Sequence, residues 1–77
     1  MPVHHFPPAL GTLVVDTNSA DRVGEFRGVT GPRRFLRPVR GGAGWEAEPV
    51  HVRPATPVER LRAENSRRNA RSRGEVL

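Results

Sequence analysis

The sequence predicts a mainly β fold, a small antiparallel barrel of four to five strands followed by a C-terminal α-helix. Short runs of β-branched and aromatic residues recur at intervals of roughly ten residues, which is typical of small antiparallel sheets and barrels. Turns rich in glycine or polar residues separate these runs, and a helical pattern begins only at residue 56. With 77 residues, the chain has room for one small domain.

Three segments follow from the composition. Prolines at three of the first ten positions remove backbone donors and fix φ, so we expect residues 1–10 to form a flexible proline-rich lead. Residues 11–55 carry the strand patterns and are predicted to form the β-barrel domain. Residues 56–77 are predicted to form the C-terminal helix and tail.

The first hairpin is predicted over residues 12–29. Residues 12–16 are rich in β-branched side chains and read as a short, largely buried strand, and the polar run DTNSAD supplies turn-forming residues. The next strand, residues 22–29, breaks strict alternation, because Val23 and Phe26 would point to opposite faces. A bulge or bend at Gly24 is expected to bring them together.

Two further strands are predicted before the helix. Residues 33–39 form the third, with Pro38 indicating an edge or a strand end, and the glycine-rich residues 40–44 form a turn. Residues 45–52 continue as a fourth segment, with Trp45 and Ala47 on one face. At this length an SH3-like closure is the expected form of the barrel.

The helix has a clear start. Thr56 is the predicted N-cap, Pro57 the first helical residue, and Glu59 the third, which together form a capping box. Val58 and Leu61 lie on one side and are predicted to dock on the barrel.

Charge and cysteine content restrict the function classes. The net charge is +5 and all thirteen basic residues are arginine, concentrated in residues 22–40 and 57–77. Cysteine is absent, which excludes disulfides and thiolate sites. No run approaches the roughly 20 apolar residues that span a bilayer, so we expect a cytoplasmic protein without a membrane partner.

Neither a catalytic nor a metal site is predicted. His4 and His5 lie in the proline-rich lead and His51 stands alone, so a metal-ligand spacing is missing. Glu46 and Glu48 share a strand face that reads as solvated. We therefore expect a non-enzymatic protein without a cofactor.

The candidate binding residues are arginines and aromatic residues for which a structural role is also open. On the third strand, Arg33, Phe35 and Arg37 project together and could follow a phosphate backbone with a base stacked on the phenylalanine ring. The alternative, which we favour, is that these charges protect an edge strand from unwanted pairing. Trp45 is either a core anchor, the favoured interpretation, or an exposed platform. The helix arginines form surface ion pairs, complement the helix dipole, or bind RNA. The full set is Arg33, Arg34, Phe35, Arg37, Arg40, Trp45, Arg67, Arg68 and Arg71.

Three stretches carry a resemblance to known proteins: VVDTNSADRVGEFRG, LRPVRGGAGWEAEP and VRPATPVERLRAENSRRNARSRGE. In this order they resemble a group of short uncharacterised proteins of actinomycetes such as Streptomyces. That resemblance implies a compact domain and assigns no functional residue. The β segment is also similar in outline to SH3-like barrels, including the KOW modules of ribosomal and transcription proteins.

The leading hypothesis is a small interaction module with a regulatory or accessory role through contacts with a protein partner. The alternative is a nucleic-acid or ribosome-associated module that binds RNA or DNA through the arginine-rich strand and helix. Small size and the lack of catalytic motifs favour both over an enzyme.

Overall fold

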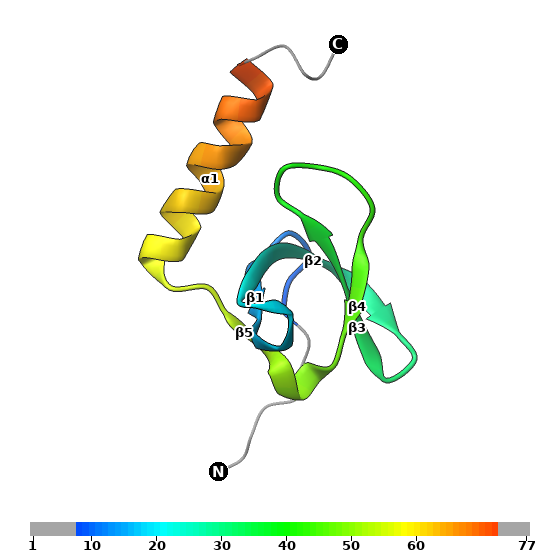
Figure 1. Cartoon of the computed structure of the whole chain (residues 1–77). Coiled ribbons are helices and arrows are strands. Elements are labelled where there is room, and N and C mark those ends of the chain that lie inside the picture. Colours follow the sequence, from blue (N-terminus) through cyan, green and yellow to red (C-terminus); the bar gives the residue numbers. More distant parts are fainter. Residues whose placement is uncertain (1–7, 73–77) are drawn as a thin grey trace.

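The fold is a five-stranded antiparallel sheet with one C-terminal helix beside it (Figure 1). The computed structural model describes the backbone of residues 8–72 and the side chains of residues 8–69. The elements are β1 (Leu13–Asp16), η1 (Thr17–Ser19), β2 (Arg22–Thr30), β3 (Arg33–Pro38), β4 (Trp45–Ala47), η2 (Pro49–His51), β5 (Val52–Pro54) and α1 (Pro57–Ser72). The predicted mainly β fold with a C-terminal helix is confirmed.

The strand order is β4-β3-β2-β1-β5, with every neighbouring pair antiparallel. In this hydrogen-bonded ladder β4 and β5 are the two edges, and they do not pair with each other. Strand β3 lies between β4 and β2, so the favoured interpretation of residues 33–39 as a charged edge strand is wrong. Its Pro38 marks the end of the strand instead.

The fourth segment predicted over residues 45–52 contains two strands in the structure. Strand β4 ends at Ala47, and a 3₁₀ turn, η2, follows before β5 begins at Val52. Pro49 stands at the start of this turn, where its missing amide is tolerated, and His51 N donates to the Glu48 carbonyl. The turn takes the chain from β4, which pairs with β3, to β5, which pairs with β1 and forms the opposite edge of the sheet.

The core consists of two clusters on opposite faces of the sheet. The helix-side cluster contains Leu13, Val15, Ala55 and Ala63, with Val23 and Val39 packed against it. The inner cluster contains Val14, Phe26, Leu36 and Ala47, with Trp45 and Val52 packed against it. Because successive strand residues point to opposite faces, β1 feeds both clusters and all four of its residues are buried.

The irregularity in β2 lies after Phe26, not at Gly24 as predicted. Gly24 pairs regularly with Val14 and Pro38, and the register shifts between Phe26 and Gly28. Val23 therefore stays in the helix-side cluster while Phe26 enters the inner cluster. Glycine is needed at position 24 because a Cβ there would lie 2.7 Å from Trp45 Cη2.

Helix α1 begins as predicted, but its docked face differs. Thr56 N donates to Glu59 Oε1 at 2.8 Å and Glu59 N donates to Thr56 Oγ1 at 3.1 Å, which confirms the capping box. Val58 and Leu61 are exposed, so the predicted apolar docking face is wrong. The helix contacts the sheet through the small side chain of Ala63, which permits close approach.

Candidate binding groove between the helix and the sheet

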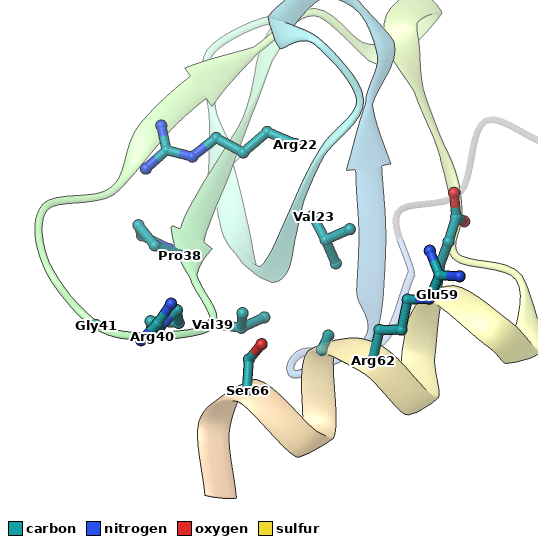
Figure 2. A pocket seen from close by; sticks show the side chains of 10 residues that line it. Arg22, Val23, Pro38, Val39, Arg40, Gly41, Glu59, Arg62 and Ser66 are labelled. Atoms are coloured by element: carbon teal, nitrogen blue, oxygen red, sulfur yellow. The ribbon is translucent and has the colours of Figure 1, made fainter. Parts of the chain in front are cut away.

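A groove with a volume of about 420 Å³ lies between α1 and the ends of two strands (Figure 2). The start of β2, the end of β3 and the turn that follows β3 form one wall, and α1 forms the other. Its lining residues are Arg22, Val23, Pro38, Val39, Arg40, Gly41, Glu59, Arg62, Ala63 and Ser66. The volume falls within the range of about 300–1,000 Å³ that is usual for ligand pockets.

The floor of the groove is apolar. Val23 and Val39 are half-buried and pack against the helix-side cluster, and Ala63 belongs to that cluster. The floor is therefore continuous with the core, and its shape is set by the contact between α1 and the sheet.

The rim of the groove is basic, with Arg40 on the sheet side and Arg62 on the helix, whereas the guanidinium of Arg22 points away from the groove (Figure 2). Arg40 and Arg62 are exposed, and neither makes a hydrogen bond or ion pair within residues 8–69. Their charges are thus available to an anionic ligand.

Glu59 is the one acidic residue among the lining residues, and its charge is already compensated. Its two carboxylate oxygens accept from the Arg53 guanidinium at 2.9 and 2.8 Å, and Oε1 also accepts from Thr56 N. The hydrogen bond from Arg53, followed by that from the Thr56 backbone, lowers the pKa of Glu59 from 4.5 to about 2. Glu59 therefore offsets little of the positive charge of the rim.

Arg22 is positioned by Trp45. Its guanidinium carbon lies 4.1 Å from the centre of the indole ring, a cation–π contact, and Trp45 Nε1 donates to Asp16 Oδ2 at 2.8 Å. Asp16 is 3% exposed, and its other carboxylate oxygen accepts from Asn18 N. Trp45 is half-buried against the inner cluster with its N–H bonded, so this side chain anchors the fold and holds the Arg22 guanidinium on the face of the sheet away from the groove floor.

The predicted arginine stripe of β3 is separate from the groove. The Arg33 guanidinium lies 3.8 Å from a carboxylate oxygen of Glu46 and 3.7 Å from one of Glu48, so acidic side chains flank it. Phe35 is half-buried. Arg37 is exposed and Arg34 is half-buried. Because side chains alternate along a strand, Arg34 projects to the face opposite to that of Arg33 and Phe35. These residues do not form an uninterrupted basic track.

The predicted helix residues Arg67 and Arg68 do not line the groove. Arg67 forms an ion pair with Glu25 of β2 at 2.7 Å, and this pair ties the helix to the sheet. Its buried Nε atom makes no hydrogen bond within the described residues. Arg68 is exposed and interacts with another group, whereas the side chain of Arg71 lies outside the described residues.

Of the predicted binding residues, only Arg40 is among the lining residues of the groove, and Trp45 contacts Arg22 on the opposite face of the sheet. Sequence reasoning missed Arg22 and Arg62. A signal for the helical wall was present, because residues 59, 62, 63 and 66 follow the spacing i, i+3, i+4, i+7 of one helix face.

Within residues 8–72, no three histidine, aspartate or glutamate side chains gather where they could hold a metal ion. The described part of the chain also contains no helix with the length and apolar character needed to cross a bilayer. Comparisons with protein-family models, curated proteins and solved structures found no match for this chain.

Proposed function

We propose that this chain is a non-enzymatic, SH3-like interaction module that binds an acidic segment of a partner protein. The binding site is the groove between α1 and the sheet. The observation that carries this proposal is the combination of an apolar floor with Arg40 and Arg62 on the rim, in a groove formed by the packed elements of the fold.

The charge of the groove supports an acidic ligand. Guanidinium groups bind carboxylates in a bidentate geometry, and arginine is enriched at protein interfaces. Arg40 and Arg62 stand on opposite walls, so a ligand lying along the groove meets a cation on each side (Figure 2). Glu59 repels such a ligand little, because Arg53 compensates its charge.

The same surfaces favour a protein ligand over a nucleic acid. Binding of single-stranded nucleic acid uses aromatic faces for stacking along a basic track. One face of Trp45 is covered by Arg22, and Glu46 and Glu48 flank Arg33 on the β3 stripe. The apolar floor of the groove suits an aliphatic side chain better than a phosphate.

Titration calorimetry with oligoglutamate at low salt provides the test. We expect binding that saturates. Arg40→Glu combined with Arg62→Glu should weaken binding at least about tenfold, since each lost charged contact is worth 1.5–3 kcal/mol.

The control is Arg27→Glu combined with Arg60→Glu, which changes the net charge equally. Both arginines are exposed, outside the groove, and unpaired within residues 8–69. Equal weakening in both double variants, or no binding of oligoglutamate by the wild-type protein, would contradict the proposal. Tighter binding of single-stranded RNA than of oligoglutamate would favour the nucleic-acid alternative.

A further inference from the structure

The floor and the rim of the groove differ in chemistry, and this difference specifies the ligand further. Val23, Val39 and Ala63 form an apolar strip that continues into the helix-side cluster. Arg40 and Arg62 stand on the two sides of this strip (Figure 2). A ligand that satisfied only the arginines would leave the strip in contact with water.

We infer that the groove recognises an extended acidic segment in which one aliphatic side chain is flanked by carboxylates. The aliphatic side chain packs on Val23, Val39 and Ala63, and the flanking carboxylates bind Arg40 and Arg62. This inference rests on the proposed function and names the partner segment of the same site. Charge complementarity and the apolar floor are its two independent grounds.

Arg22 is not among the groups that bind this ligand. Stacking on Trp45 holds its guanidinium on the face of β2 opposite to Val23, and Trp45 is in turn fixed by the buried Asp16. The carboxylates of the ligand therefore bind Arg40 and Arg62.

The experiment compares two peptides of equal length and charge, Glu-Glu-Leu-Glu-Glu and Glu-Glu-Gln-Glu-Glu, by titration calorimetry. Leucine and glutamine have similar size, so the pair isolates the apolar contact. We expect the leucine peptide to bind the wild-type protein about five- to tenfold more tightly, because only leucine makes the apolar contact. This ratio corresponds to a difference of about 1–1.4 kcal/mol in binding free energy.

Protein variants assign this preference to the floor. Val39→Thr keeps the side-chain shape and adds a hydroxyl, so the preference for leucine should fall below about twofold. Val29→Thr is the control, because Val29 is 53% exposed and does not line the groove. It should leave the preference unchanged.

The outcomes are distinguishable. Equal binding of the two peptides overturns the inference and leaves the proposed function standing, whereas failure of both peptides to bind overturns both. A leucine preference that survives Val39→Thr also overturns the inference. Displacement of the leucine peptide by single-stranded RNA, or a dimer in sedimentation that Arg40→Glu abolishes, assigns the groove to another occupant and overturns it.

Discussion

Replacing Gly24 by alanine tests how tightly the inner face of the sheet is packed. An added Cβ would lie 2.7 Å from Trp45 Cη2, 3.0 Å from the Arg37 carbonyl oxygen and 3.3 Å from Leu36 Cβ. The carbonyl is part of the paired strand β3 and the indole is held by its hydrogen bond to Asp16, so neither can move without a cost.

The magnitude follows from two opposing effects. Overpacking of a core by one carbon costs about 1–3 kcal/mol, and the reduced freedom of the unfolded chain returns about 0.4–1 kcal/mol. We therefore expect Gly24→Ala to lower the free energy of unfolding by about 1–2 kcal/mol. For a domain of this size that corresponds to a fall in Tm of about 5–15 °C, measured by far-ultraviolet circular dichroism.

A double-mutant cycle locates the origin of the effect. Trp45→Phe removes the ring atom nearest to the added Cβ, so Gly24→Ala should cost at least about 0.5 kcal/mol less in that background. The reasoning is refuted if Gly24→Ala matches or exceeds the wild-type stability, or if the two substitutions are additive.

Three further predictions concern α1 and the groove. The folded-state pKa of Glu59, about 2, lies below its ordinary value of 4.5, so ionised Glu59 stabilises the fold above pH 4.5, and this contribution is lost as the pH falls toward 2. Urea unfolding across this range should show that Glu59→Gln removes that part of the acid dependence; an unchanged profile would contradict it. Leu61→Ala should change stability by less than about 0.5 kcal/mol and Ala63→Leu should cost about 1–3 kcal/mol, because the first side chain is exposed and the second is docked; the reverse order in urea unfolding would favour a helix docked through Leu61. Binding of an acidic peptide should weaken as NaCl is added, since the rim charges are exposed and screened by salt; calorimetry that shows no salt dependence would remove the arginines from the site.

The parts of the fold that depend on local signals could be predicted from the sequence. Residues 12–16, which are rich in β-branched side chains, and the capping box of Thr56 and Glu59 act within a few residues of the chain, and both elements begin within one residue of the expected position. The polar turn after Asp16 is local in the same way, with Asp16 Oδ1 accepting from Asn18 N.

The parts that depend on distant residues could not be predicted in this way. Trp45 and Asp16 are 29 positions apart, and their hydrogen bond explains both the role of the tryptophan and the need for Gly24. Helix α1 docks through Ala63, because a small side chain allows the helix to approach the sheet closely. The sequence pattern had predicted docking through the larger Leu61, which is exposed.

The candidate site shows the same division. The concentration of arginine in residues 22–40 and 57–77 indicated which segments carry the charge, and the rim of the groove combines Arg40 from the first with Arg62 from the second. Which arginines face the groove depends on how α1 crosses the sheet, a tertiary property without a local signature. The β3 stripe had the stronger sequence signal, but Glu46 and Glu48 lie beside its Arg33.

The most direct measurement is a structure of the protein with the Glu-Glu-Leu-Glu-Glu peptide bound. Binding in the groove predicts the leucine side chain against Val23, Val39 and Ala63, with peptide carboxylates within hydrogen-bond distance of Arg40 and Arg62. A peptide bound instead along the β3 stripe, or along the exposed Val58 and Leu61 face of α1, would contradict the assignment of the groove as the binding site.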